Sequence, residues 1–162
     1  MPELTHPLIH VGSILPTLGL VDGGGARTDL RPSSQALLLV FVHPGRCPAC
    51  VSYLSEAEGA LEDLCGWGTA LVGVVPAGDP PVEAGFPVLV DQGDATRRRL
   101  GIGPGEAAVL LADRWGEVFE VATYGAEHGL PLPRQLIESA KIVDLSCGEC
   151  NVADPHWRTP EP

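Results

Sequence analysis

The segment Cys47-Pro48-Ala49-Cys50 stands between an apolar run and a helical pattern. The run at 37–42 has the length of a buried strand, and after the cysteines apolar residues recur at helical spacing from Val51 to Leu64. The two cysteines are therefore expected at a strand-to-helix turn. Pro48 suits the first position of the helix, because its missing N–H costs nothing there.

A thiol at the start of a helix is suited to redox chemistry. The free backbone N–H groups and the positive end of the helix dipole stabilise a thiolate. On this interpretation Cys47 is the exposed attacking thiol, and Cys50, one turn into the helix, is the resolving thiol. Arg46 either stabilises the Cys47 thiolate by its charge or simply faces solvent.

A second cysteine pair, Cys147 and Cys150, offers a competing interpretation, because four thiolates can bind zinc. About a hundred residues separate the two pairs, whereas zinc fingers usually keep their half-sites much closer together. This spacing favours a redox role for the first pair. For the second pair a private disulfide, an electron-relaying dithiol and a metal site remain open, the metal site being one in which His156 gives a third ligand and a second chain completes the set.

Composition limits the class of protein. The chain has 162 residues, of which 44% are hydrophobic and 19% charged, which is enough for one domain with a proper core. We assign residues 1–146 to this domain and 147–162 to a C-terminal tail. A net charge of −11 argues against binding to nucleic acid. No apolar run is long enough to span a membrane and no secretory signal is recognisable, so we expect a cytoplasmic protein without membrane contact.

The predicted elements follow one another in a definite order. An N-terminal hairpin precedes a strand, a long helix, a second strand, a short apolar segment and a short helix, and a second hairpin and a last helix complete the domain. Arg97, Arg98 and Arg99 are predicted to form a solvated face of the short helix, with a substrate-steering patch as the alternative. Cys65 is predicted to be a small core residue on the long helix. The expected ranges are 11–22 with 27–30, 37–42, 48–64, 69–75, 86–90, 94–100, 107–112 with 117–122, and 133–145.

This order, with Cys-x-x-Cys at the first strand-to-helix junction, resembles the thioredoxin fold. It is most similar to the redoxin group, which contains AhpC/TSA-type peroxiredoxins and TlpA-like thiol-disulfide oxidoreductases. The resemblance implies an α/β fold whose central mixed sheet is flanked by helices and extended by an N-terminal β-hairpin. It also implies a thiol-disulfide oxidoreductase that acts through Cys47 and Cys50 on protein or low-molecular-weight disulfides, with no cofactor. The pattern carries no signal for the oligomeric state.

The chain departs from the peroxiredoxin pattern around its first cysteine. Peroxiredoxins carry the motif Pro-x-x-x-Thr-x-x-Cys. When its cysteine is aligned with Cys47, Val40 stands in place of the proline and Pro44 in place of the threonine. Ala107 stands where an arginine, or the cis-proline of thioredoxins, is expected, and Pro104 lies three residues earlier. A peroxiredoxin-like peroxidase therefore remains an alternative, as does a non-enzymatic zinc-binding or interaction module that uses both cysteine pairs.

Thioredoxins bury an acid on the first core strand as a proton acceptor, and the run at 37–42 contains none. His43 is the nearest candidate for proton transfer. The simpler interpretation of His43 is a partly exposed loop histidine.

Overall fold

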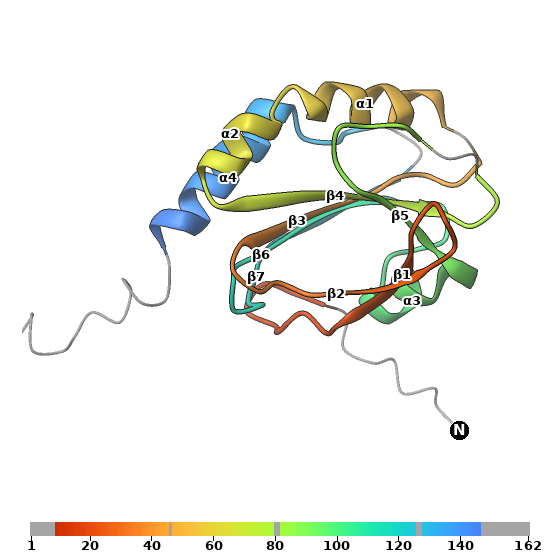
Figure 1. Cartoon of the computed structure of the whole chain (residues 1–162), viewed down its shortest axis with the longest axis horizontal. Helices are drawn as coiled ribbons and strands as arrows, with labels where there is room; N and C mark the ends of the chain where they lie inside the picture. Colours follow the sequence, from red (N-terminus) through yellow and green to blue (C-terminus); the bar gives the residue numbers. More distant parts are fainter. Residues whose placement is uncertain (1–8, 46, 80–81, 126–127, 147–162) are drawn as a thin grey trace, which may run out of the picture.

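The structure is a computed structural model that describes residues 9–45, 47–79, 82–125 and 128–146 (Figure 1). Most of the predicted elements are present, with bounds that differ by a few residues. In chain order they are β1 (Leu18–Val21), β2 (Arg27–Leu30), β3 (Ala36–Phe41), α1 (Pro48–Glu58), α2 (Leu61–Gly66), β4 (Thr69–Pro76), β5 (Val88–Asp91), the short 3-10 helix η1 (Gln92–Asp94), α3 (Ala95–Leu100), β6 (Ala107–Ala112), β7 (Val118–Tyr124) and α4 (Pro133–Leu145).

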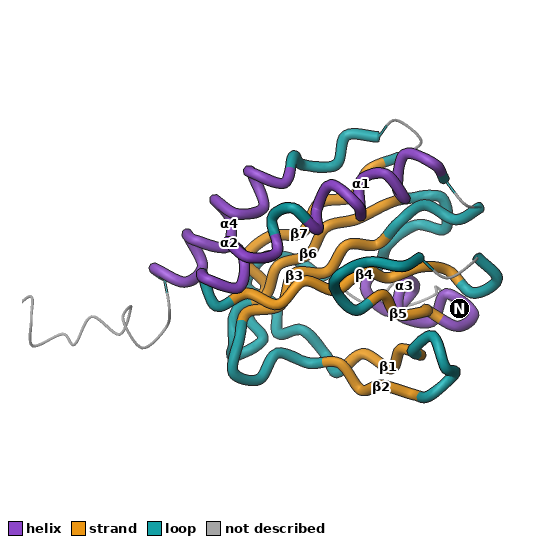
Figure 2. The backbone as a smooth tube through the Cα atoms, turned by 45° about the horizontal axis from the view of Figure 1, so that its top comes forward, coloured by secondary structure: helices purple, strands orange, loops and turns teal. Residues whose placement is uncertain are grey.

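The strands form one mixed seven-stranded sheet in the order β2-β1-β5-β4-β3-β6-β7. β3, β4 and β5 are parallel, whereas β6 and β7 run antiparallel to their neighbours. The β1–β2 hairpin adds to the sheet through an antiparallel contact between β1 and β5 (Figure 2). The predicted mixed sheet with an N-terminal hairpin extension is therefore confirmed.

Side chains of β3 divide between two cores because successive strand residues point to opposite faces of the sheet. Leu38 and Val40 pack with the buried sides of α1, α2 and α4, which cover one face. Leu37, Leu39 and Phe41 pack on the other face, against the N-terminal hairpin and α3. A strand that is buried on both faces explains the uninterrupted apolar run in the sequence.

The long helix predicted after the cysteines is two helices. α1 ends at Glu58, and α2 begins at Leu61 after a tight turn in which the Gly59 N–H donates to the carbonyl of Glu56. Because α2 starts anew at Leu61, the residues that face the core differ from those of one continuous helix. Leu64 is buried, and its neighbour Cys65 is exposed. The prediction that Cys65 is a core residue is therefore wrong.

The arginine triplet is also not a uniform solvated face. Arg97 is only 1% exposed, whereas Arg98 and Arg99 are exposed as predicted. Successive helical residues are about 100° apart, so three in a row cannot share one face. The Arg97 guanidinium donates to the backbone carbonyls of Val42 and of Glu106, the latter at 2.6 Å. Arg97 thus ties α3 to the sheet, next to the end of β3.

The sheet places its loops at two opposite edges. β3 and β7 run in the same direction, because each is antiparallel to β6. The loop before α1 and the loop before α4 therefore emerge at the same edge, and α4 ends at the opposite end of the molecule (Figure 1). Among the described residues, no helix has both the length and the apolar character needed to cross a bilayer.

Candidate redox site

Helix α1 begins where the sequence predicts. Pro48 is its first residue, and Cys47 precedes it and accepts the backbone N–H of Val51 at 3.1 Å through its carbonyl. Cys47 is partly exposed, whereas Cys50 is 1% exposed and lies on the buried side of α1. The two sulfurs lie within 4.8 Å of each other. One accessible thiol and one covered thiol therefore stand close enough to pair after a small movement.

His43 lies against the buried thiol and is itself only 7% exposed, so its interpretation as a partly exposed loop histidine is wrong. Its backbone N–H donates to the Cys50 sulfur at 3.3 Å, and its ring Nδ1 lies 3.2 Å from the same sulfur. Its Nε2 lies 2.6 Å from the carbonyl oxygen of Gly125 and 3.3 Å from that of Tyr124. A carbonyl only accepts, so Nε2 carries the proton, and in neutral histidine Nδ1 is left to accept the Cys50 thiol proton.

Burial controls the ionisation of Cys50. Loss of water around the sulfur raises the pKa of Cys50 from 9.0 to about 11, against the opposing effect of the His43 backbone N–H. The positive charge of Arg97 also acts to lower this pKa. Cys50 is therefore a neutral thiol near pH 7 and needs a base before it can act as a nucleophile.

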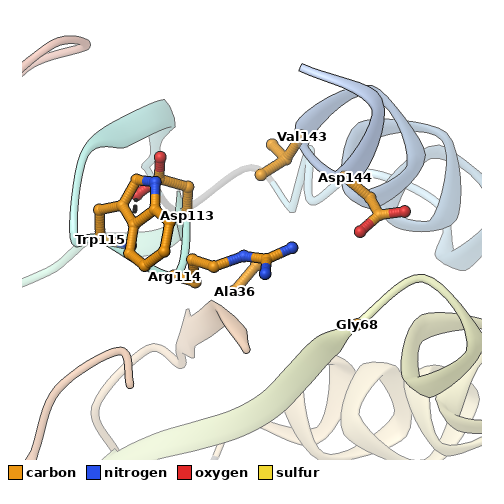
Figure 3. A pocket seen from close by; sticks show the side chains of 7 residues that line it. All are labelled: Ala36, Gly68, Asp113, Arg114, Trp115, Val143 and Asp144. Atoms are coloured by element: carbon orange, nitrogen blue, oxygen red, sulfur yellow. Dashed lines mark hydrogen bonds between the residues drawn. The ribbon is translucent and has the colours of Figure 1, made fainter. Parts of the chain in front are cut away.

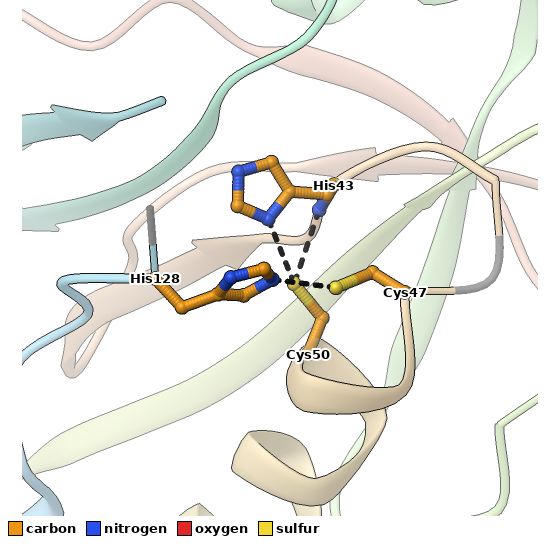
Figure 4. Close-up of side chains that lie close together, drawn as sticks. All are labelled: His43, Cys47, Cys50 and His128. Atoms are coloured by element: carbon orange, nitrogen blue, oxygen red, sulfur yellow. Dashed lines mark hydrogen bonds between the residues drawn. The ribbon is translucent and has the colours of Figure 1, made fainter. Parts of the chain in front are cut away.

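His128 is a site residue that sequence reasoning missed. Its Nε2 lies 2.6 Å from the Cys47 sulfur, and its ring meets the His43 ring edge-on with centroids 4.6 Å apart (Figure 4). It comes from the loop between β7 and α4. The Tyr53 hydroxyl of α1 donates to the Pro131 carbonyl at 2.7 Å and so fastens this loop over the site.

The signal for His128 was topological. A loop that follows a strand running in the same direction as β3 opens at the same edge of the sheet as the cysteines. Such a loop, together with its histidine, is a candidate contributor to the site. The residue lies eighty-one positions from Cys47, and no local spacing relates the two.

A cation lies near the site, but not where the peroxiredoxin pattern expects one. Ala107, at the expected position, is the buried first residue of β6. The nearby charge comes instead from Arg97 of α3, whose guanidinium spans the end of β3 and the residue before β6. Burial lowers the pKa of Arg97, and its acidic neighbours act to raise it.

A hollow beside the thiols has mostly aliphatic walls. Its apolar side chains come from the end of β3, from α1, from β4 and from the segment after β4. The lining residues are Val42, His43, Cys47, Cys50, Val51, Leu54, Val75, Asp79 and Val82.

A second hollow lies at the opposite edge of the sheet, between the β6–β7 turn and the end of α4 (Figure 3). Its described lining contains neither cysteine nor histidine. The lining residues are Ala36, Gly68, Asp113, Arg114, Trp115, Val143 and Asp144.

Four predicted residues lie outside the part of the chain that the structure describes: Arg46, Cys147, Cys150 and His156. Their proposed roles stay predictions. The residues that the structure does bring together are Cys47, Cys50 and His43, with His128 as the unpredicted fourth.

Neither a protein-family model nor a curated protein matches this sequence. Solved structures do match the fold. Peroxiredoxin Q of Xanthomonas campestris is 19% identical with a TM-score of 0.69, covering 83% of this chain and 99% of its own. AhpC of Mycobacterium tuberculosis is 13% identical with a TM-score of 0.68, covering 88% and 98%.

A third structure belongs to a protein named for a different activity. It is a putative thiol:disulfide interchange protein DsbE from Chlorobium tepidum, 20% identical with a TM-score of 0.63, covering 82% of this chain and 99% of its own. At these identities the likeness speaks for the fold. The chain therefore has the thioredoxin-like fold that these structures share.

Proposed function

We propose that the chain is a thiol-disulfide oxidoreductase that uses Cys47 and Cys50 as its redox couple. The observation that carries the proposal is the contact between the Cys50 sulfur and His43 Nδ1, which pairs a buried resolving thiol with a base. Structures with this fold include a protein named as a thiol:disulfide interchange protein, which agrees with the proposal.

The first step is attack by the Cys47 thiolate on a substrate disulfide. The partly exposed position of Cys47 at the start of α1 gives it access to the substrate, and the positive end of the helix dipole stabilises its thiolate. A bond forms between Cys47 and one substrate sulfur, and the substrate S–S bond breaks. The other substrate sulfur leaves as a thiolate.

The second step is resolution by Cys50. His43 Nδ1 takes the thiol proton of Cys50, and the resulting thiolate attacks the Cys47 sulfur. The Cys47–Cys50 disulfide forms, the mixed disulfide breaks, and the second substrate sulfur leaves as a thiolate that takes a proton. The carbonyls of Tyr124 and Gly125 accept from Nε2, which leaves Nδ1 free to take this proton. Overall, one dithiol is oxidised and one disulfide is reduced.

The aliphatic hollow beside Cys47 favours disulfides with apolar flanking groups. Val51 is 42% exposed at the rim of this hollow, next to the attacking thiol. An apolar side chain adjacent to a substrate cysteine would bury its surface there, with a gain of about 25 cal/mol per Å².

A thiol peroxidase is the second candidate, because the cation of Arg97 lies near the buried thiol. Two features argue against it. Two guanidinium nitrogens of Arg97 already donate to carbonyl groups, and Pro44 supplies no hydroxyl at the position of the peroxiredoxin threonine. Consumption of hydrogen peroxide by the reduced chain, faster than by free thiols and lost in Cys47→Ser, would reverse this ranking.

The test is reduction of insulin by dithiothreitol in the presence of a metal chelator. The wild-type chain should accelerate precipitation of the insulin B chain, and Cys47→Ser should remove the acceleration. Cys65→Ser, which replaces an exposed thiol on α2 away from the site, serves as the matched control and should behave as wild type. Equal rates for wild type and Cys47→Ser would refute the proposed function.

A further inference from the structure

The redox site gathers two sulfurs and two imidazole nitrogens in one place. Cys47 and Cys50 come from the start of α1, His43 from the loop before it, and His128 from the loop before α4. One ligand-type atom from each residue lies within 4.8 Å of all the others (Figure 4). Thiol-disulfide exchange requires the two sulfurs and a base, and the fourth group goes beyond that requirement.

The distances are close to those of a tetrahedral metal site. Zinc binds cysteine sulfur at about 2.3 Å and histidine nitrogen at about 2.0–2.1 Å, so its ligand atoms lie about 3.3–3.8 Å apart. The His43 Nδ1 to Cys50 Sγ distance is 3.2 Å, and the Cys47 Sγ to His128 Nε2 distance is 2.6 Å. Side-chain movements of about an ångström would convert this cluster into the tetrahedral geometry that S₂N₂ sites give zinc.

The outer contacts of the cluster also suit a metal site. Metal-binding histidines usually donate their second ring N–H to a carbonyl or a carboxylate, which fixes the direction of the free nitrogen. His43 does so through Nε2, which lies 2.6 Å from the Gly125 carbonyl oxygen, while Nδ1 faces the sulfurs. The bond from Tyr53 to Pro131 holds the loop that carries His128.

We propose that the reduced chain binds one Zn²⁺ through the thiolates of Cys47 and Cys50, Nδ1 of His43 and Nε2 of His128. Binding releases the two thiol protons and transfers no electrons. The two thiolate charges balance the charge of the ion, which suits a site with two buried ligands. Exposed His128 and partly exposed Cys47 form the side from which the ion enters.

One consequence rests on the proposed function. A Cys47–Cys50 disulfide has no thiolates, so the oxidised chain loses the site. A substrate disulfide that oxidises the zinc-bound dithiol yields the protein disulfide, two substrate thiolates and free Zn²⁺. Bound zinc should therefore slow disulfide exchange, and oxidation should release it.

The test uses the full-length reduced chain with Cys147→Ser and Cys150→Ser, so that the tail thiols cannot contribute. Competition with a chromophoric chelator measures zinc stoichiometry and affinity. We expect one zinc per chain, and an affinity that falls at least ~10-fold in His128→Asn. His128 is exposed in a loop, so this change leaves the core intact. His10→Asn changes an exposed histidine outside the cluster. The chain that carries it should bind zinc with the same affinity as the chain with only the two tail cysteines replaced.

Cobalt provides a readout of geometry. Co²⁺ in the same background should give the intense visible bands of a tetrahedral ion and a near-ultraviolet thiolate charge-transfer band, and oxidation to the disulfide should abolish both. Absence of zinc binding, an octahedral cobalt spectrum, or equal affinity in His128→Asn would overturn the proposal.

These outcomes separate the metal site from the proposed function. Insulin reduction in chelator measures disulfide exchange without metal. Exchange without zinc binding would refute the metal site alone, and zinc binding without exchange would refute the oxidoreductase alone.

Discussion

His43 Nδ1 and the Cys50 sulfur lie 3.2 Å apart on the buried side of the Cys47-Pro48-Ala49-Cys50 turn. The backbone N–H of the same histidine also donates to that sulfur, at 3.3 Å. On the proposed mechanism this one residue both accepts the thiol proton and stabilises the thiolate that remains. We propose that this histidine, which follows β3, replaces the buried acid that the resemblance to thioredoxins leads one to expect.

His43→Asn should slow resolution of a mixed disulfide at Cys47 by about 100-fold at pH 7, because the buried thiol loses its base. The deficit should shrink as the pH approaches 11, where Cys50 ionises without help. The measurement uses an aromatic disulfide reagent whose thiolate is coloured. Attack by Cys47 releases the first thiolate, resolution by Cys50 releases the second, and the rate of the second release is compared.

That experiment needs a background in which the other thiols are silent, so Cys65, Cys147 and Cys150 are replaced by serine. His10→Asn is the matched control, because it removes an exposed histidine far from the thiols in sequence. A second release of equal rate in His43→Asn, at every pH, would exclude His43 as the base.

Cys50 should make stability depend on pH in the alkaline range. The folded-state pKa of about 11 exceeds the ordinary value of 9.0, so the folded state keeps the proton longer than the unfolded state does. The resulting contribution, about 2–3 kcal/mol, is complete below pH 9 and is lost as the pH rises through 11. Urea unfolding under reducing conditions should show a shallower alkaline loss in Cys50→Ser, while Cys65→Ser follows wild type. An equal loss of stability with rising pH in Cys50→Ser and wild type would contradict this prediction.

Arg97→Met should lower the free energy of unfolding by about 2–4 kcal/mol, because two buried carbonyls lose their charged donor. Those carbonyls belong to Val42 and Glu106. Arg98→Met changes an exposed neighbour on the same helix and should cost less than about 0.5 kcal/mol. Urea denaturation compares them, and equal costs would show that the burial of Arg97 contributes nothing to stability.

The rate at which each cysteine is alkylated should follow the solvent exposure of its thiol. In the reduced chain at pH 7, iodoacetamide should modify Cys47 and Cys65 well before Cys50, which is covered and protonated. Peptide mass spectrometry gives the order directly. Early modification of Cys50 would mean that the site opens far more than the structure indicates.

Much of the fold could be predicted from local patterns. The run at 37–42 is apolar at every position because β3 is buried on both faces, and the position of Pro48 marks the start of α1. The break at Gly59 was not predicted, because a tight turn can carry the apolar pattern across two helices. The exposure of Cys65 follows from that break.

The site could be predicted only where its residues are close in the sequence. Cys47, Cys50 and His43 belong to one strand-turn-helix segment, whereas His128 reaches them through the order of the strands. Arg97 looked like part of an exposed charge run, and its burial depends on the carbonyls of the residue after β3 and the residue before β6, which the sheet brings together. Such contacts exist only once the sheet is formed.

Whether Cys47 and Cys50 form one redox couple can be measured by equilibrating the full-length chain with mixtures of reduced and oxidised glutathione in the presence of a metal chelator. Acid quenching, alkylation and peptide mass spectrometry then give the linkage at each ratio. We predict an intramolecular Cys47–Cys50 disulfide that forms in a single two-electron transition and is independent of protein concentration. A stable glutathione adduct at Cys47 without the intramolecular bond, or a dominant link from Cys47 to Cys147 or Cys150, would contradict it.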